Sequence, residues 1–199
     1  LWVDAFVGYS RACYQACGRI ITLYGANQLF QLEDGAPAER LEIIPNGIDY
    51  EKYAAIERHK PERPTVALIG RVVPIKDIKT YIRACDMLRK QIPDVPALVL
   101  GPTDEDSDYH ADCMEMVRHL GLQETIAFPG RVQLTEYLGK VDVLALSSIS
   151  EAQPLVILEG GAAGLPTVAT NVGSCEELLL GRPDEDPKLG PGGAVVPLA

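Results

Sequence analysis

The sequence predicts an α/β fold with a doubly wound parallel sheet, and three observations lead to this prediction. Short runs rich in β-branched residues alternate with stretches of helical apolar spacing along all 199 residues. These short runs are continuously apolar, which is typical of parallel strands buried on both faces. The 18 Gly and 15 Pro residues are spread along the chain, as expected for many short elements joined by tight turns.

In the N-terminal quarter of the chain, the sequence predicts two helices and two strands. Residues 1–17 and 25–34 have the spacing of helices, and residues 19–24 and 41–44 are short β-branched runs. The charged stretch 57–64, which contains Pro at two positions, predicts a linker.

After this linker the alternation becomes more regular. The expected strands are 65–69, 97–100, 125–128, 141–146, 167–170 and 194–196. The expected helices are 76–91, 108–120, 133–139, 154–164 and 173–180. Because open parallel sheets bind ligands beyond the carboxyl ends of their strands, we expect the functional residues in the loops 70–77, 101–107, 129–133 and 147–154.

Composition narrows the class of protein. With 18 basic and 28 acidic residues the net charge is −10, which argues against nucleic acid as a partner. No apolar run reaches the ~18 residues of a membrane span, and no signal peptide opens the sequence. Because the chain starts without Met inside a helical pattern, we expect it to be a fragment.

The cysteines and histidines predict neither a disulfide framework nor a metal site. The five cysteines are odd in number and contain no CxxC pair, which favours buried thiols in a reducing compartment. They are Cys13, Cys17, Cys85, Cys113 and Cys175. The three histidines, His59, His110 and His119, lack the spacing of metal ligands.

The segment GRVVPIKD, residues 70–77, follows a strand and opens a helix. Gly70 permits a tight exit from the strand. Arg71 and Lys76 stand on either side of the expected helix N-terminus, whose free N–H groups favour an anion. A planar guanidinium combined with an ammonium suits a pyrophosphate. The alternative is that both are solvated surface cations.

The segment SEAQPLVILE, residues 150–159, predicts a second group of ligand contacts. Pro154 suits the first position of a helix. The N–H groups of Leu155, Val156 and Ile157 would then be unpaired and face the ligand edge of the sheet.

Two carboxylates lie in this second segment, eight residues apart. Glu151 is in the loop, and Glu159 is on a helix that is apolar all round and therefore expected to be buried. Together they could hold two hydroxyl-rich groups. The alternative is that Glu151 is an ordinary exposed carboxylate and that Glu159 bonds to a backbone group of the core.

Three other segments are less specific. Asn46 and Gly47 predict a turn with positive φ, and Gly130 to Val132 predicts a loop on the ligand edge. Asp104, Asp106, Asp108 and Glu115 imitate a calcium loop, but Tyr109 stands where that loop requires Gly. Acidic residues in the first turn of a helix explain this run better, so no metal site is expected.

Taken together, these motifs resemble the retaining GT-B glycosyltransferases of family 4. The resemblance is carried by PNGID, GRVVPIKD, FPGRV and the pair Glu151 and Glu159, which occur in this order. The segments GRVVPIKD, GPTDED and SISEAQPLVILEG further resemble segments of the cytosolic glycosyltransferases of bacterial Pel exopolysaccharide synthesis. The resemblance implies Rossmann-like domains. Residues 1–48 would be a remnant of the N-terminal acceptor domain with the hinge, and residues 49–199 the donor-binding domain without its final crossover helix.

The resemblance also implies a substrate and roles for the residues. The donor would be UDP-glucose or a related UDP-hexose, with no cofactor and no metal, and the acceptor a growing exopolysaccharide or other glycan bound through the N-terminal domain. The partner would be a membrane-bound polysaccharide synthase complex, at the inner face of the membrane in the cytoplasm. The residues expected to act in catalysis are Arg71 and Lys76 on the diphosphate and Glu151 on the donor sugar. The residues expected to bind the donor or mark the hinge are Asn46, Gly47, Gly70, Arg131, Val132, Gln153, Pro154, Leu155, Val156 and Glu159.

Within that scheme, Glu159 would hold the ribose, and Arg131 with Val132 would border the base. One departure concerns the sugar contact: many family members have an aromatic residue and then Gly, where this chain has Ala152, Gln153 and Pro154. Two other functions stay open, a sugar-nucleotide epimerase of the same fold and a non-catalytic module that binds a nucleotide sugar. The product, an epimerised sugar nucleotide or a new glycosidic bond, distinguishes them.

Overall fold

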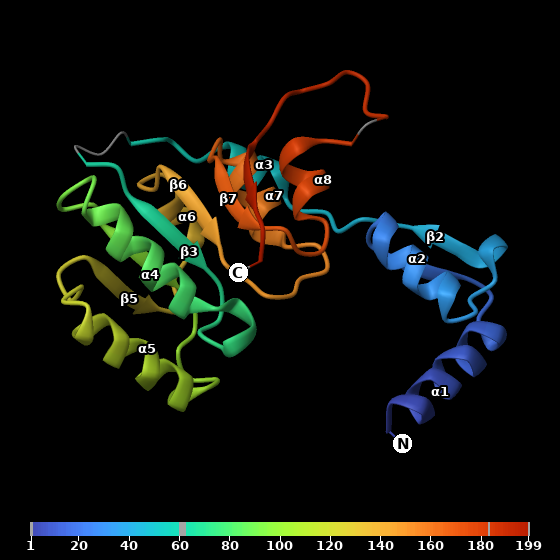
Figure 1. The fold of residues 1–199 in the computed structure, drawn as a ribbon. Helices are drawn as coiled ribbons and strands as arrows, with labels where there is room; N and C mark the ends of the chain where they lie inside the picture. The colour runs from blue at the N-terminus through green and yellow to red at the C-terminus, as the bar shows by residue number, and fades with distance from the viewer. Residues whose placement is uncertain (1, 60–62, 183, 199) are drawn as a thin grey trace.

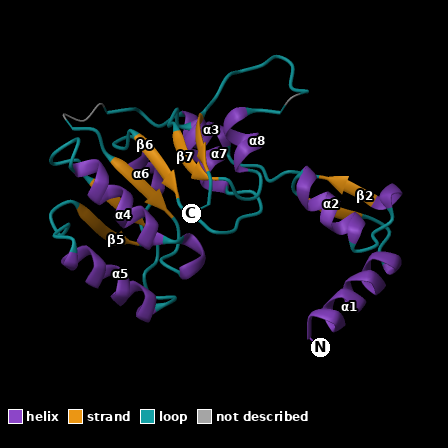
Figure 2. Cartoon of the chain, in the orientation of Figure 1, coloured by secondary structure: helices purple, strands orange, loops and turns teal. Residues whose placement is uncertain are grey.

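The computed structural model describes residues 2–59, 63–182 and 184–198, and contains two separate parallel sheets (Figures 1 and 2). Residue 1 of the expected first helix and residues 60–62 of the expected linker lie outside the described residues. The larger sheet has six strands: β3 (Val66–Ile69), β4 (Ala97–Leu100), β5 (Ile126–Gly130), β6 (Val143–Leu146), β7 (Thr167–Thr170) and β8 (Gly193–Val196). All of its strand pairs are parallel, which confirms the predicted fold class.

The order of the strands determines where a ligand can bind. Across the sheet the order is β5-β4-β3-β6-β7-β8, so the chain winds outward from β3 in one direction and then from β6 in the other. Ala67 of β3 pairs with Leu98 of β4 on one side and with Leu144 of β6 on the other. The chain therefore turns to opposite faces of the sheet after β3 and after β6, and open parallel sheets bind ligands at the carboxyl ends of such a strand pair.

Helices cover both faces of this sheet (Figure 1). One face packs against α4 (Ile78–Arg89) and α5 (Ser107–His119), and the other against α3 (Tyr50–Ala54), α6 (Leu134–Leu138) and α7 (Leu155–Ala162). The helix α8 (Cys175–Leu180) packs beside β7 and β8. Alternate residues of one strand serve the two faces: Leu68 of β3 contributes to the first core and Ala67 to the second.

The sequence analysis missed α3 and two short 3-10 turns, η1 (Ala38–Arg40) and η2 (Pro74–Lys76). Asp49 caps α3 by accepting a hydrogen bond from the Lys52 N–H at 3.2 Å. Five residues are too few for the periodicity of a helix to show. The turn η2 delays the start of α4 from residue 76, as expected, to Ile78.

The prediction of buried thiols is confirmed for three cysteines and wrong for two. Cys85, Cys113 and Cys175 are buried, and burial raises the pKa of each thiol to about 11. Cys13 and Cys17 are exposed. Cys13 lies on α1 (Trp2–Ala16) and Cys17 just after it, and α1 makes few contacts with the other described helices and strands.

The N-terminal segment forms the second sheet. It consists of α1, β1 (Ile20–Thr22), α2 (Gly25–Glu33) and β2 (Leu41–Ile43), and β1 pairs with β2 alone. Its apolar residues Phe6 and Leu29 are uncovered, with 67% and 60% of their surfaces exposed. Across the described residues, no helix combines the length and apolar character needed to cross a bilayer.

We expect the N-terminal segment to be less stable than the large sheet. Amides of β1 and β2 should exchange hydrogen at least about tenfold faster than those of β3 and β6, because their two-stranded sheet has little apolar cover. Hydrogen exchange with mass spectrometry measures this, with sedimentation to establish the oligomeric state. Equal protection in a monomer would contradict the expectation, whereas a dimer that buries Phe6 and Leu29 would explain equal protection by new cover.

Candidate functional site

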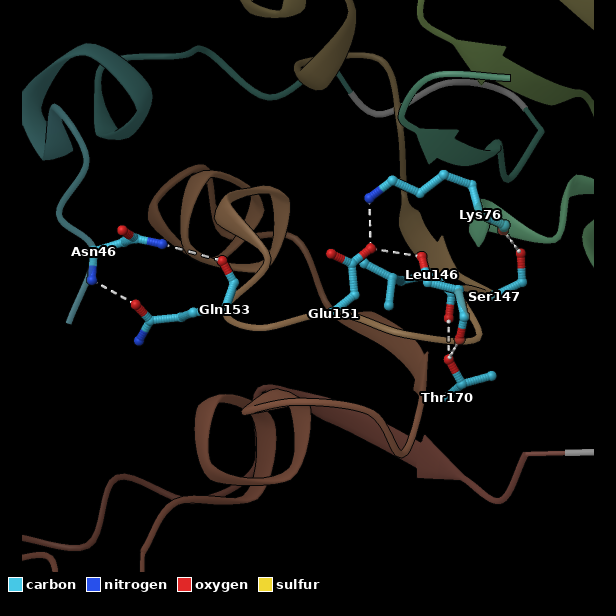
Figure 3. Close-up of polar contacts among 8 residues, drawn as sticks. Asn46, Lys76, Leu146, Ser147, Glu151, Gln153 and Thr170 are labelled. Carbon is cyan, nitrogen blue, oxygen red and sulfur yellow. Dashed lines mark hydrogen bonds and ion pairs between the residues drawn. The ribbon is translucent and has the colours of Figure 1, made fainter. Parts of the chain in front are cut away.

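Two loops meet at the carboxyl ends of β3 and β6. The loop after β6 bonds to the loop after β3 through its backbone, where the Ile149 N–H donates to the Ile75 carbonyl at 2.9 Å. The Ser147 hydroxyl lies 3.0 Å from the Lys76 carbonyl oxygen (Figure 3) and 2.9 Å from that of Asp77, and donates to one of them at a time. These bonds fix the end of η2 and hence the position of Lys76.

The centre of the site is an ion pair between these loops. Lys76 Nζ lies 2.5 Å from Glu151 Oε1, and the Ser148 hydroxyl donates to the same oxygen at 2.7 Å (Figure 3). The Lys76 and Glu151 side chains are only 19% and 14% exposed. The alternative that Glu151 is an ordinary exposed carboxylate is therefore wrong, and so is the alternative that Lys76 is a solvated surface cation.

Arg71, the second cation of the predicted site, has a different partner. Its guanidinium pairs with Glu105, which lies in the loop after β4, and both side chains are about half exposed. In the structure, Arg71 and Lys76 therefore pair with two different carboxylates, those of Glu105 and Glu151. Glu105 was missed because an acidic residue in an acidic loop has no distinguishing sequence signal.

The loops after β3, β4 and β5 enclose a pocket of about 230 Å³, and its lining residue Gly70 lies next to the Lys76 side chain. Its walls consist of four of the predicted site residues, three further apolar residues and two residues of the loop after β4. They are Ile69, Gly70, Arg71, Leu100, Gly101, Pro102, Arg131, Val132 and Leu134. Gly101 is required here, because at φ +157° its Cα approaches the backbone of Gly70 so closely that a Cβ would overlap the carbonyl. Mostly apolar walls with a few polar groups suit a flat heterocycle.

Of the two helices that begin in these loops, α7 and not α4 has a free N-terminus. Asp77 caps α4, accepting from the Thr80 N–H at 3.2 Å, so its carboxylate already occupies the place that we predicted for an anion. Pro154 is the N-cap of α7 rather than its first residue, and no side chain caps that helix. Within the described residues the N–H groups of Leu155 and Val156 have no backbone partner, as predicted.

Two details of α7 differ from prediction. The Ile157 N–H is not free, because it donates to the Pro154 carbonyl at 3.2 Å. The helix is not buried all round: Leu155 is 44% exposed, and only Ile157 and Gly160 of its described residues are buried. One side of α7 therefore faces the open edge of the domain.

Glu159 bonds to a side chain that the sequence analysis did not single out. The hydroxyl of Tyr53 in α3 donates to Glu159 Oε1 at 2.7 Å, so the expected alternative of a core backbone partner is wrong. Burial, followed by this hydrogen bond to Glu159, raises the pKa of Tyr53 to about 12. The only available signal was the capping residue Asp49, four residues before Tyr53.

The predicted hinge residue Asn46 contacts the start of α7. The Asn46 N–H donates to Gln153 Oε1 at 2.5 Å, and its side-chain amide donates to the Gln153 carbonyl at 3.3 Å (Figure 3). The expected positive φ is wrong for both Asn46 and Gly47, neither of which has the left-handed conformation. Asn46 serves as a paired hydrogen-bonding group here, rather than as a turn residue.

The end of β7 and the loop after it hold the backbone around Glu151 in place. The Thr170 hydroxyl donates to the Ser148 carbonyl at 2.6 Å, and the Ser174 N–H donates to the Ala152 carbonyl at 2.9 Å. At φ +56°, Gly173 lies so close to the Glu151 and Ala152 carbonyls that no Cβ would fit. These contacts hold the backbone of the Glu151 loop and were also missed.

The acidic run after β4 is explained by helix capping. Asp106 is the N-cap of α5 and accepts from the Tyr109 N–H at 2.9 Å, and Asp108 lies in the first turn. Among the residues that the structure describes, no cluster of His, Cys, Asp and Glu could hold a metal ion. The Asp106 cap and the place of Asp108 in the first turn confirm the interpretation of this run as a helix start.

Comparisons with known proteins are consistent with this geometry. The chain is 28% identical over 158 residues to a D-inositol 3-phosphate glycosyltransferase of Paenarthrobacter aurescens (strain TC1), which covers 73% of the chain and 38% of that protein. It is 30% identical over 164 residues to the D-inositol 3-phosphate glycosyltransferase of Nocardia farcinica (strain IFM 10152), covering 74% of the chain and 36% of that protein. The match thus spans little more than a third of these relatives' length.

Solved structures share the fold. Anabaena Alr3699/HepE in complex with UDP and glucose matches with a TM-score of 0.73 at 23% identity, over 87% of this chain and 51% of that one. Sucrose-phosphate synthase from Thermosynechococcus elongatus matches with a TM-score of 0.76 at 22% identity, over 98% of this chain and 49% of that one. At these identities the two likenesses show a shared fold.

Two family models match different parts of the chain. A domain of unknown function (DUF3492) matches residues 1–39. The model of the glycosyl transferases group 1 matches residues 49–180, a range that includes the Lys76–Glu151 pair, the pocket beside it and the N-terminus of α7. Because this model covers about two thirds of the 199 residues, the chain belongs to the glycosyl transferases group 1 family.

Proposed function

We propose that the chain forms the donor site of a retaining glycosyltransferase of family 4, which transfers a hexose from a UDP-sugar to a glycan. The observation that carries this proposal is the convergence of Lys76, Glu151 and the free N-terminus of α7 at the carboxyl ends of β3 and β6. This places a cation, a carboxylate and unpaired N–H groups beside a pocket fit for a heterocycle.

Each part of a nucleotide sugar has a candidate partner. The base would enter the pocket bordered by Arg131 and Val132. The diphosphate would meet Lys76, Arg71 and the N–H groups at the start of α7. Glu159 would accept hydrogen bonds from the ribose hydroxyls, and Glu151 from the hydroxyls of the sugar.

The proposed chemistry is cleavage of the bond between the sugar and the diphosphate. As this bond breaks, negative charge grows on the departing diphosphate, and the sugar gains oxocarbenium character. Lys76, Arg71 and the α7 N–H groups would stabilise that charge without a metal. The contact between Lys76 and Glu151 keeps both charges in one place, so the diphosphate would meet its cation beside the carboxylate that binds the sugar.

We extend this proposal to the identity of the donor and of the acceptor. The complexes of HepE with UDP, with UDP-glucose and with UDP and glucose support UDP-glucose as the donor. Resemblance to the Pel glycosyltransferases supports an exopolysaccharide acceptor, reached through the N-terminal domain. We further propose a cytoplasmic location at the inner face of the membrane, with a membrane-bound polysaccharide synthase complex as partner. The relatives reported above are named for an inositol phosphate and not for a polysaccharide.

We expect UDP and UDP-glucose to bind without added divalent metal. The partners of the diphosphate are Lys76, Arg71 and backbone N–H groups, none of which needs a cation to attract an anion. Isothermal titration with UDP, GDP, ADP and their sugars, in the presence of a chelator, checks this and ranks the bases. Binding that the chelator abolishes and magnesium or manganese restores would contradict the expectation.

Assays of the reaction product distinguish the alternative functions. Incubation with UDP-glucose, followed by analysis of the nucleotide sugar, detects an epimerised product if the chain is an epimerase. A glycosidic bond formed to an added glycan identifies a transferase. Nucleotide binding with neither product, in a preparation that includes the acceptor domain, would favour a binding module.

A further inference from the structure

The carboxylate of Glu159 is held by the protein at one oxygen only. The Tyr53 hydroxyl donates to Oε1 at 2.7 Å. Counting the residues that the structure describes, Oε2 has no hydrogen-bond or ion-pair partner in the protein. Glu159 is half-buried, so Oε2 is free to accept hydrogen bonds from a bound molecule.

Tyr53 is rigidly placed for this contact. It lies in α3, which packs against α7, and only 7% of its surface is exposed. A Tyr hydroxyl is protonated at neutral pH, and here its pKa is raised further to about 12, so it acts as a donor to the carboxylate. Packing alone would be satisfied by the ring, whereas the hydroxyl serves the bond to Glu159.

We propose that Tyr53 is a positioning residue that orients the Glu159 carboxylate for the ribose hydroxyls of the nucleotide. This inference rests on the proposed function, which gives Glu159 its role at the ribose. The last torsion of a Glu side chain is broad and roughly two-fold, so an unanchored carboxylate must lose rotational freedom when it binds a diol. The hydrogen bond from Tyr53 removes that freedom before the ligand arrives, and pre-organisation of this kind raises affinity.

The test compares two nucleotides that differ only at the ribose. Tyr53→Phe keeps the ring and removes the hydroxyl. Isothermal titration of this variant should show UDP binding about three- to tenfold weaker than in the wild type, the cost of ordering one side chain. Binding of 2′,3′-dideoxy-UDP, which offers Glu159 no ribose hydroxyl, should be unchanged. In a Glu159→Ala background, Tyr53→Phe should have no further effect on UDP.

Tyr81→Phe is the matched control. Tyr81 is 3% exposed, and its hydroxyl lies 3.2 Å from each of the carbonyl oxygens of Val66 and Leu98, on the opposite face of the sheet. Its loss should lower the melting temperature, as the loss of a buried hydrogen bond does, and should leave the affinities for both nucleotides unchanged.

The outcomes separate the inference from the function beneath it. If Tyr53→Phe weakens both nucleotides equally, strengthens UDP binding or changes neither, the positioning role is overturned while the proposed function stands. If the wild type binds UDP and 2′,3′-dideoxy-UDP equally, the ribose role of Glu159 is overturned together with the inference. A wild type that binds no UDP would overturn both proposals.

Discussion

Replacing Lys76 with Ala is expected to weaken UDP binding by about ten- to a hundredfold, the cost of one hydrogen bond to a charged group. Where transfer is measured, the rate should fall by about 100-fold or more, because negative charge on the diphosphate is greatest in the transition state. Titration with UDP and with uridine locates the effect, since uridine carries no phosphate and its affinity should not change. Equal loss for both ligands would contradict a role at the diphosphate.

Loss of Lys76 also leaves Glu151 without its cation, so stability must be measured alongside affinity. The Glu151 side chain is only 14% exposed, and an unpaired carboxylate there should lower the melting temperature. Adding Glu151→Gln to Lys76→Ala removes that charge and should restore stability without restoring UDP binding. Lys79→Ala is the matched control, because Lys79 pairs with Asp112 on α5 and not with a residue of the proposed site.

The second large effect distinguishes the two glutamates. Glu159→Gln should weaken UDP and UDP-glucose alike, and Glu151→Gln should weaken only UDP-glucose, because Glu159 is assigned to the ribose and Glu151 to the sugar. Each loss should be about ten- to a hundredfold in dissociation constant. Removing the charge of Glu151 also releases Lys76, so UDP affinity should not fall in that variant.

Titration of both variants with both ligands decides between these roles. Equal loss of UDP affinity in the two variants would show the assignment to be wrong. If Glu159 has only a structural role through Tyr53, Glu159→Gln would lower the melting temperature and leave nucleotide affinity unchanged in the folded fraction. The Gln side chain can still accept the Tyr53 hydrogen bond, so the variant should fold.

Much of the fold was predictable from local pattern. The strands of the large sheet are short apolar runs, such as Val66–Ile69 and Ala97–Leu100, and turn residues or polar segments separate them from helices. Helix α4 was visible because Ile78, Tyr81, Ile82 and Cys85 recur at helical spacing, and all four are buried. By contrast, α3 spans only five residues and escaped notice, although its residue Tyr53 bonds to the site.

The site was predictable as a set of loops rather than as a set of contacts. GRVVPIKD and SISEAQPLVILE both stood out because cations or carboxylates follow buried strands. That Lys76 pairs with Glu151, while Arg71 pairs with Glu105, could not be read from either motif. Pairing depends on which loops become neighbours, and the strand order β4-β3-β6 brings each pair together.

The sequence by itself determined the class of fold, the loops that carry the chemistry and the types of side chain available there, because periodicity, turn residues and charge are local properties. Only the tertiary structure decided which groups meet. Tyr53 and Glu159 are 106 positions apart, and Asn46 and Gln153 are 107 apart. A contact over such a separation arises when α3 and the preceding segment pack along α7, and a single sequence contains no signal for that packing. The same reason explains why the free helix N-terminus proved to be that of α7: whether Asp77 turns back to cap α4 depends on the geometry of η2, which Ser147 from a distant loop holds in place.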